Sequence, residues 1–336
     1  MAVDDRAIVV GISHYPGLTS SALAGAENDA QAFYAWLRSP SEGNVPEDNI
    51  VRIVSSTFSL GEDPVSAQPT AEAVKAAIDR LYVIGDKGNG HVGRRLYLFM
   101  AGHGLARGLR DAALLMANAA KNRTGHHVPG APYADWFRES AFFDEVVLFM
   151  DCCLEDNKLS PLQPCHLDPV SGSKPARYYY ALAAEFSQPA RELPDDNGEM
   201  RGVFTAAILA GLRQGPPDGG DVTGAWLEGF APQYMTRLLG GKDSQTPRFD
   251  YERTKDIVFV KRTAASYRVR IHADLTSRSL TIEMCDGTLN VIPPSDRSNG
   301  IWEWELGPGI YRYGYTDGPR EFLELIAEER EIDVHL

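Results

Sequence analysis

The sequence predicts an α/β domain with a mostly parallel six-stranded sheet, followed by a small all-β sandwich. In residues 1–262, short continuous apolar runs alternate with helical patterns, which is the order of a layered α/β domain. Apolar runs that do not alternate with polar residues indicate strands buried on both faces, as in a parallel sheet. Residues 263–336 alternate apolar and polar residues between turns rich in Gly and Pro, which is typical of an antiparallel sandwich.

Six apolar runs, each of about five residues, are the predicted strands of the sheet. In chain order they are Ala7–Ile12, Ile50–Val54, Leu96–Met100, Val146–Met150, Tyr178–Ala183 and Ile257–Val260. Their short length and their Val, Ile, Leu and aromatic residues favour strands over buried helices.

Three segments between these runs have the apolar spacing of helices. In Thr70–Tyr82 apolar residues recur three and four positions apart and form one stripe, and Glu27–Leu37 repeats this spacing. Gly202–Leu212 is apolar almost throughout, which predicts a well-buried helix. Thr70 is the expected N-cap of its helix.

The last 74 residues carry five predicted strands of the sandwich. They are Tyr267–Ile271, Ser279–Met284, Ile301–Leu306, Gly309–Tyr315 and Glu321–Ala327. Turn signals such as Asp286-Gly287 and Asp317-Gly318-Pro319 separate them. We therefore expect two domains, residues 1–262 and residues 263–336.

The 336-residue chain has a formal net charge of −13. Binding to nucleic acid or to an anionic membrane needs clustered Lys and Arg, so this balance argues against both. The N-terminus lacks the long apolar core of a signal peptide, and no window reaches the roughly 18 apolar residues of a membrane span. With only four cysteines, we expect no disulfide framework and a cytoplasmic, reducing location.

Two polar clusters follow two of the predicted strands. His103, flanked by glycines, comes just after one strand, and the pair Cys152–Cys153 comes just after another. Because the carboxyl ends of parallel strands meet at one edge of a sheet, the thiol and the imidazole can meet there. A cysteine needs a base or a cation to become a thiolate at neutral pH, and histidine supplies one. The alternative interpretation is a packed core cysteine and a histidine in a turn.

Six short segments, in the same order along the chain, are similar to motifs of one enzyme family. They are Val10–Ile12 with Tyr15-Pro16, Leu23–Ala30, Met100–Gly104, Asp151–Cys153, Gly202–Thr205 and Gln245–Pro247. His103 precedes Cys153 by 50 residues, a separation similar to that in caspases. Residues 5–262 thus resemble a metacaspase-type, caspase-like cysteine peptidase of bacterial type.

The resemblance implies the caspase-hemoglobinase fold, a three-layer α/β/α domain, and hydrolysis of peptide bonds through an acyl-enzyme. It makes Cys153 the nucleophile, His103 its base, and the backbone amides of Gly104 and Cys153 the oxyanion donors. Cys152 remains the alternative nucleophile.

The resemblance also implies that Asp29 and Asp151 line the first specificity pocket. Two carboxylates in one pocket favour a cation, and arginine can pair with a carboxylate in bidentate fashion. We therefore expect cleavage after Arg and less efficient cleavage after Lys. The alternatives are a charge at a helix N-terminus for Asp29 and a cap at a strand end for Asp151.

The proline-rich segment Leu154–Arg177 is expected to form an exposed loop. In the family this region is often cut during activation, and Lys158, Lys174 and Arg177 offer sites for self-processing or for an upstream protease. The alternative is a passive surface loop.

The expected partners are protein or peptide substrates, with an activating protease or a regulatory protein; nucleic acid and membrane are not expected. We expect no cofactor and no metal. Cys165-His166 with His126-His127 could suggest zinc, but Cys152, Cys153, Cys165 and His166 lack the paired ligand spacing of a zinc site. Relatives of this class act in regulated cell death or antiviral defence. The alternative function is an inactive caspase-like scaffold for protein–protein interaction.

Overall fold

The computed structural model divides the chain into two compact units, residues 1–213 with 223–259, and residues 214–222 with 260–336. The residues that it describes are 4–18, 23–88, 90–106, 109–153, 155–156, 162–169, 174–185, 188–195, 197–216, 219–241, 245–262, 267–273, 281–286, 289–298, 300–307, 309–325 and 331–336.

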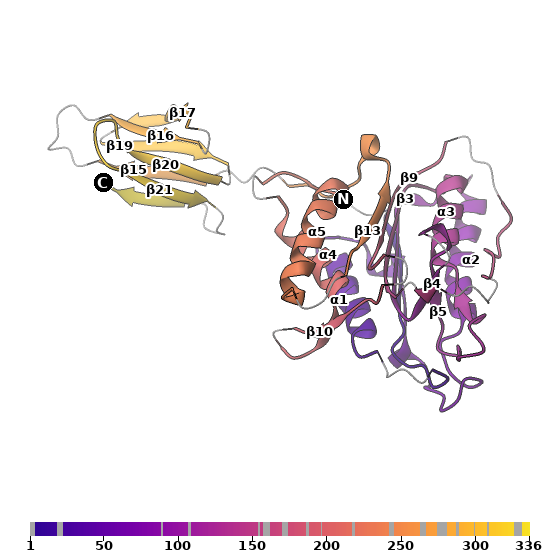
Figure 1. Ribbon diagram of the computed structural model, residues 1–336. Coiled ribbons are helices and arrows are strands. Elements are labelled where there is room, and N and C mark those ends of the chain that lie inside the picture. The colour runs from indigo at the N-terminus through magenta and orange to yellow at the C-terminus, as the bar shows by residue number, and fades with distance from the viewer. Residues whose placement is uncertain are drawn as a thin grey trace. The chain divides into compact units, whose positions relative to one another are not determined.

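A six-stranded sheet forms the centre of the first unit (Figure 1). From edge to edge its strands are β13 (Arg248–Tyr251), β9 (Arg177–Leu182), β7 (Phe143–Cys152), β3 (Gly93–Gly102), β1 (Arg6–Gly11) and β2 (Ile50–Val54). All neighbours are parallel except β13, which runs antiparallel to β9. The predicted α/β class and the mostly parallel six-stranded sheet are confirmed.

The sixth strand of this sheet is not the predicted one. Ile257–Val260 contributes β14 (Val258–Val260), which belongs to a separate two-stranded sheet with β12 (Val222–Thr223). The edge position is taken by Arg248–Tyr251, whose side chains are all at least partly exposed. An edge strand of this kind has no continuous apolar run, so the pattern that finds buried strands passes over it.

Five helices cover the two faces of the sheet, which makes the predicted three layers (Figure 1). One side carries α1 (Ala26–Arg38), α4 (Val203–Gln214) and α5 (Gly224–Leu239), and the other carries α2 (Ala71–Lys87) and α3 (Gly130–Ser140).

Two helices, α3 and α5, escape the sequence prediction because each contains proline and glycine, which normally interrupt helical patterns. Thr70 occupies the N-cap of α2 as predicted, but its side chain makes no capping hydrogen bond.

The alternating side chains of β7 point to two different faces of the sheet. Leu148, Met150 and Cys152 belong to the large core cluster that includes residues of α2 and α3. Phe149 faces the other way, since its ring packs against Phe33 of α1 with centroids 5.5 Å apart. This parity places neighbouring residues at the end of β7 in different environments.

Shorter elements complete the first unit. A four-stranded sheet has the order β6 (His127–Val128), β5 (Ala113–Leu115), β4 (Gly104–Ala106) and β8 (Glu155–Asp156). A hairpin pairs β10 (Glu192–Pro194) with β11 (Met200–Gly202). Single 3₁₀ turns lie at Glu47–Asn49, Ser55–Thr57, Leu109–Asp111 and Arg253–Lys255.

Where the structure describes it, the segment after β7 is largely exposed, as the sequence predicts, but it is not free of the rest of the first unit. Residues 162–169 are held to the body of the first unit, with the Gln163 amide 2.8 Å from His127 Nε2 and His166 bonded to both Tyr133 and Asp79. Arg177 is the first residue of β9 and pairs with the buried Glu145, so it lies in the sheet. Lys174 is exposed, and Lys158 lies outside the described residues.

The second unit contains two four-stranded sheets. One has the order β18 (Asp296–Ser298), β19 (Ile301–Leu306), β15 (Tyr267–His272), β22 (Glu331–His335), and the other β17 (Val291–Ile292), β16 (Ile282–Cys285), β20 (Gly309–Tyr315), β21 (Arg320–Leu325). Side chains from both sheets form one core cluster that includes Trp304 and Met284. The expected sandwich is therefore present, but β15 and β22 are parallel, so it is not wholly antiparallel.

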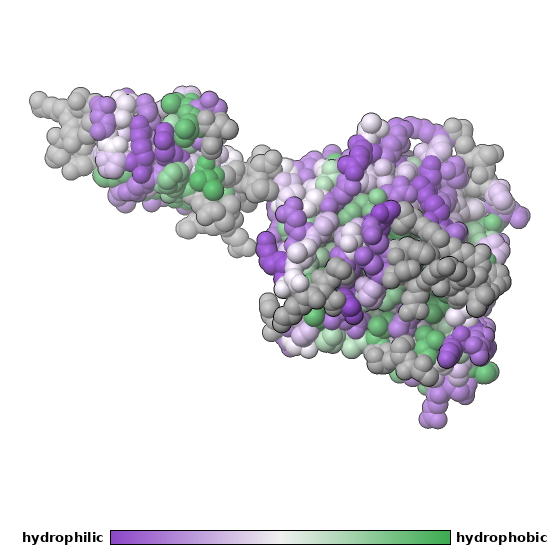
Figure 2. Space-filling model, in the orientation of Figure 1, coloured by the Kyte–Doolittle hydropathy of each residue, from purple (hydrophilic) through white to green (hydrophobic). Residues whose placement is uncertain are grey.

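The surface in view is largely hydrophilic on the first unit, whereas apolar residues gather on part of the second (Figure 2). Among the exposed large apolar side chains are Leu289, Val291, Ile310 and Phe322, all on or next to the sheet formed by β17, β16, β20 and β21. Within the described residues, no helix combines the length and the apolar character needed to cross a membrane.

Candidate active site

His103 and Cys153 follow neighbouring parallel strands at the same edge of the sheet. Gly102 of β3 and Cys152 of β7 are register partners, so the residue after each strand occupies the equivalent position. The structure thus brings the loops of the predicted pair together at the carboxyl edge. Gly102 has a φ of +152°, which L side chains rarely adopt, and a Cβ there would lie 2.4 Å from Tyr15 Oη. Only glycine fits this turn into His103.

Tyr15 holds the backbone of His103. Its hydroxyl accepts a hydrogen bond from the His103 amide at 3.0 Å and donates one to the Leu115 carbonyl at 3.1 Å. Its ring lies edge-on to the imidazole, with centroids 4.8 Å apart. In turn, the Leu115 amide donates to the His103 carbonyl at 2.8 Å. Burial lowers the pKa of His103, which favours the neutral imidazole that a general base requires.

The two adjacent cysteines occupy different environments. Cys152 is 1% exposed and packs in the core cluster, and its burial raises the pKa of its thiol well above the ordinary value. Cys153 comes after the end of β7 and is only partly buried. The parity of β7 explains the difference, because Cys152 continues the row of residues that faces α2 and α3. A thiol held in this way is closed to a large substrate, whereas Cys153 as a residue is partly exposed.

Gly104 brings the histidine loop against the cysteine strand. A Cβ at this position would lie 2.5 Å from Cys152 Sγ and 2.8 Å from the carbonyl oxygen of Cys153. Contacts this close admit only a residue without a side chain. Glycine at 104 therefore lets the backbones around His103 and Cys153 approach each other.

The sulfur of Cys153 also contacts a segment far away in the sequence. The backbone N–H of Ala190 donates to Cys153 Sγ at 3.1 Å, and the thiol lies 3.8 Å from the Ala190 carbonyl oxygen. Ala190 lies between the end of β9 and the β10–β11 hairpin, so the chain just before this hairpin contacts the candidate nucleophile.

Asp29 and Asp151 converge at the N-terminus of α4. Both carboxylate oxygens of Asp29 accept the Gly202 amide, at 3.0 and 2.9 Å. Asp151 Oδ2 accepts the amide of Thr205 at 3.0 Å and its hydroxyl at 2.6 Å. A Cβ on Gly202 would lie 2.1 Å from Asp151 Oδ2 and 2.6 Å from Asp29 Oδ2. The structure thus brings together the two aspartates selected from the sequence, and both also satisfy donors at the start of α4.

A third carboxylate, Glu192 of β10, lies beside this pair. Burial raises the pKa of Asp29 well above its usual value, and the charge of Asp151 adds to the shift. Burial also raises the pKa of Asp151 to about 6, assisted by the charge of Glu192 and opposed by the hydrogen bonds from Thr205. Glu192 Oε1 accepts the Gly25 amide at 3.0 Å, before the first turn of α1. Several buried acids in one place favour a bound cation.

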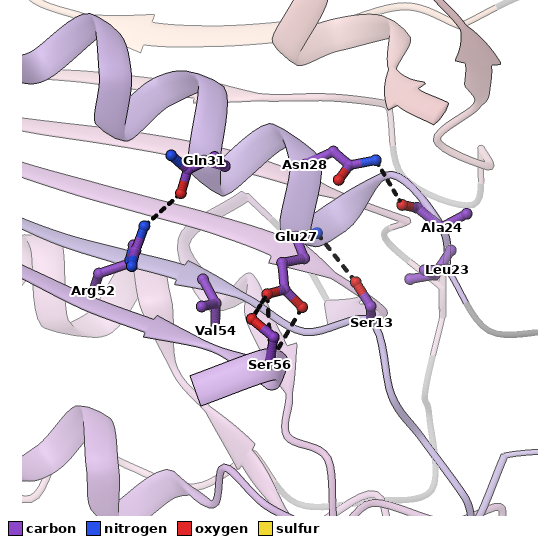
Figure 3. Close-up of a pocket in the computed structure, with 9 residues that line it drawn as sticks. All are labelled: Ser13, Leu23, Ala24, Glu27, Asn28, Gln31, Arg52, Val54 and Ser56. Carbon is purple, nitrogen blue, oxygen red and sulfur yellow. Dashed lines mark hydrogen bonds between the residues drawn. The ribbon is translucent and has the colours of Figure 1, made fainter. Parts of the chain in front are cut away.

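A pocket of about 530 Å³ lies at the start of α1, beside the ends of β1 and β2 (Figure 3). Its lining includes Ser13, Glu27, Asn28 and Arg52, but neither His103 nor Cys153. Glu27 points toward Ser56, and Asn28 points toward the Ala24 carbonyl. Asn28 Nδ2 also donates to the Met200 carbonyl at 3.0 Å. This bond connects the pocket to β11, next to the acidic cluster formed by Asp29, Asp151 and Glu192.

Sequence reasoning gave no role to several residues of this site. Tyr15 and Thr205 lie within the segments that carry the family resemblance, so these motifs could have identified them as site residues. Glu192 and Ala190 carry no such signal, since only chain folding brings them near Asp151 and Cys153. In the portion of the chain that is described, no three His, Cys, Asp or Glu side chains are grouped so as to hold a metal ion.

Comparison with known proteins places these features in a family. Residues 4–258 match the family model of the caspase domain. A probable protease from a Desulfuromonadales bacterium is 28% identical over 222 residues, which are 62% of this chain and 26% of that protein. This chain therefore spans about a quarter of the length of that relative.

Two solved structures are similar at low identity. A crystal structure of a protein from Geobacter sulfurreducens is 15% identical, with a TM-score of 0.45, and covers 77% of this chain and 97% of its own. The structure of pro-sf-caspase-1 is 14% identical, with a TM-score of 0.45, and covers 76% of this chain and 94% of its own. The match to the family model runs from the first described residue to the start of β14, close to the end of the first unit. It confirms the caspase-like resemblance seen in the sequence, and the chain belongs to the caspase domain family.

Proposed function

We propose that the protein is a cysteine endopeptidase that cleaves protein substrates after basic residues, with Arg preferred over Lys. The observation that supports this proposal is the register pairing of Gly102 with Cys152, because His103 and Cys153 are the next residues after these partners at the same edge of the sheet. The Desulfuromonadales relative, named a probable protease, supports a peptidase in the same family.

The chemistry of such a site follows from its groups. His103 takes the proton of the Cys153 thiol, and the thiolate attacks the scissile carbonyl carbon. The backbone amides of Gly104 and Cys153 stabilise the oxyanion that forms. Collapse expels the amine, which takes the proton back from His103 and leaves a thioester on Cys153. A water molecule deprotonated by His103 then hydrolyses the thioester and restores the thiol.

The acidic cluster supports a preference for basic side chains. Asp29 is 1% exposed and Asp151 is 6% exposed, so a substrate cation reaches them only if the residues that cover them move. The charge of Arg201 acts on Asp29, and the Arg201 guanidinium is bonded to Asp195, Glu199 and the Asn28 carbonyl. Asp29 and Asp151 accept hydrogen bonds from backbone amides and a hydroxyl, which are neutral. The negative charge of these carboxylates can therefore pair with a substrate guanidinium.

Cleavage after Lys158 or Lys174 is part of the proposal, carried out by the protein itself or by an upstream protease. The exposure of Lys174 supports this, whereas the position of Arg177 inside β9 removes it as a processing site. A role in regulated cell death or antiviral defence, with a regulatory protein as a partner, follows from the family resemblance.

A panel of fluorogenic peptides that differ only at the residue before the scissile bond tests this function. The intact chain, assayed before and after limited cleavage by a lysine-specific protease, is expected to cut after Arg. Turnover after Lys is expected to be about tenfold lower, because lysine cannot pair with a carboxylate in bidentate fashion. Cleavage after Asp but not Arg contradicts the specificity. No turnover in either arm would favour the inactive scaffold.

Replacement of Tyr15 by phenylalanine is expected to lower kcat about tenfold and leave KM nearly unchanged. The ring stays in place, but the His103 amide and the Leu115 carbonyl lose the hydroxyl that joins them, at a cost of about 1 kcal/mol each. Steady-state kinetics on the best peptide of the panel measure this split. Tyr311→Phe, which removes a hydroxyl bonded to the Gly307 carbonyl in the second unit, is the matched control. A change in KM alone contradicts the positioning role.

A further inference from the structure

The Cys153 sulfur contacts the backbone of Ala190, which belongs to a segment distant from it in the sequence. The Ala190 amide points its N–H at Cys153 Sγ, with nitrogen and sulfur 3.1 Å apart. The Ala190 carbonyl oxygen is farther from the sulfur, at 3.8 Å. A donor nearer than an acceptor favours negative charge on the sulfur, because hydrogen bonds to a charged acceptor are the stronger ones.

The segment that carries this amide is fastened at both ends. Gln245, whose side chain is buried, accepts the Arg191 amide at 2.9 Å and donates to the Ala183 carbonyl at 2.9 Å. At the other end, the Thr246 amide donates to Gln188 Oε1 at 3.1 Å. Gln245 thus ties residues 188–191 to the end of β9, next to the strand that carries Cys153.

We propose that the Ala190 amide is a thiolate-stabilising donor for Cys153, and that Gln245 is the positioning residue that aims it. When the Cys153 proton passes to His103, the sulfur becomes an anion and the imidazole a cation. The fixed N–H dipole of Ala190 then stabilises the sulfur without reorganisation, as a backbone donor does in an oxyanion hole. The role differs from oxyanion binding because it acts on the nucleophile before substrate arrives.

The environment of His103 makes such a donor useful. Burial lowers the pKa of His103, so an imidazolium is harder to form and contributes less to holding the thiolate. Burial also raises the pKa of the Cys152 thiol, so a thiolate is disfavoured at that neighbouring residue. A backbone amide carries no charge of its own, so it favours the anion without a second buried ion.

Ala190→Pro tests the proposal, because proline removes the N–H and keeps the carbonyl. The inference rests on the proposed nucleophile but is read out without any peptide substrate. Alkylation of Cys153 by iodoacetamide is followed from pH 5 to 10 by mass spectrometry of the intact chain's peptides. The rate at low pH, relative to its own high-pH plateau, is expected to fall about tenfold, as for loss of one hydrogen bond to a charged group.

Ala190→Ser keeps the N–H and is expected to show a low-pH rate within about threefold of the wild type. Cys165 in the same molecules reports whether the fold is intact, since its half-buried thiol lies in the segment bonded to Tyr133. Equal profiles for Ala190→Pro and the wild type overturn the proposal. If Ala190→Pro does not fold, Gln245→Ala decides: a fall at low pH supports the role, and an unchanged profile overturns it.

Failure of this proposal and failure of the proposed function are distinguishable. A wild-type chain that never cuts peptides, yet shows the Ala190-dependent alkylation profile, contradicts the peptidase and keeps the donor. A chain that cuts peptides with a profile insensitive to Ala190→Pro keeps the peptidase and removes the donor.

Discussion

Peptide turnover is expected to fall by about 10⁴-fold or more in Cys153→Ala, the order of loss when the nucleophile of a catalytic pair is removed. The reason is chemical, since the remaining groups at the edge of the sheet cannot form a thioester. His103 would still bind a proton, and the oxyanion donors would remain. Initial rates on the Arg peptide, with active-site titration by an alkylating agent, measure the loss.

Cys152→Ala is the matched control for this result. It removes a sulfur of the same size from the neighbouring residue, but from a side chain that is 1% exposed and packed in the core. We expect it to lower the free energy of unfolding by about 1 kcal/mol and to leave kcat/KM within a few fold. The reverse pattern, with turnover lost in Cys152→Ala and kept in Cys153→Ala, would make Cys152 the nucleophile.

Asp151→Asn is expected to lower kcat/KM for the Arg peptide by about 10²- to 10³-fold. Asparagine can still accept the hydrogen bonds from Thr205, so the start of α4 keeps its partner while the negative charge is lost. Loss of one member of a buried charge pair costs about 2–5 kcal/mol, which sets the size of this effect. Asp29→Asn, which keeps an acceptor for the Gly202 amide, is expected to act in the same direction.

A citrulline peptide separates loss of specificity from loss of structure. Citrulline has nearly the shape of arginine but no charge, so the ratio of the two kcat/KM values isolates the electrostatic contribution. We expect this ratio to rise with pH through about 6 in the wild type, as Asp151 loses its proton, and to be flat in Asp151→Asn. If Asp151→Asn lowers kcat/KM equally for the arginine and citrulline peptides and also lowers the melting temperature, Asp151 acts only as a cap of α4.

The fold could be predicted for the parts whose local pattern carries the information. The parallel strands β1, β3, β7 and β9 contain continuous apolar runs because helices cover both faces of the sheet, and the edge strand β2 keeps apolar residues on either side of the exposed Arg52. The edge strand β13 is partly exposed along its length and has no continuous apolar run, so the sequence pattern does not predict it. The helices α3 and α5 contain proline, so their sequences do not predict helices. In the second unit the alternation predicted strands but could not give the parallel pairing of β15 with β22.

The candidate site divides in the same way. Motifs in the sequence select His103, Cys153 and the two aspartates, but they leave Cys152 as an alternative to Cys153. The parity of β7 was already present in the sequence as a row of apolar residues ending in Cys152, and it could have favoured Cys153. The contact between Ala190 and Cys153 joins residues 37 positions apart and had no local signal.

By itself, the sequence determined the α/β class, the strands buried on both faces, the family resemblance and the edge where the candidate residues gather. These features depend on apolar periodicity and on short motifs, which are local properties of the chain. Only the tertiary structure decided which strand closes the sheet, which of the two adjacent cysteines is buried in the core and how Asp29 meets Gly202, 173 positions away. Such contacts arise from packing between distant segments, and no local pattern encodes the geometry of that packing.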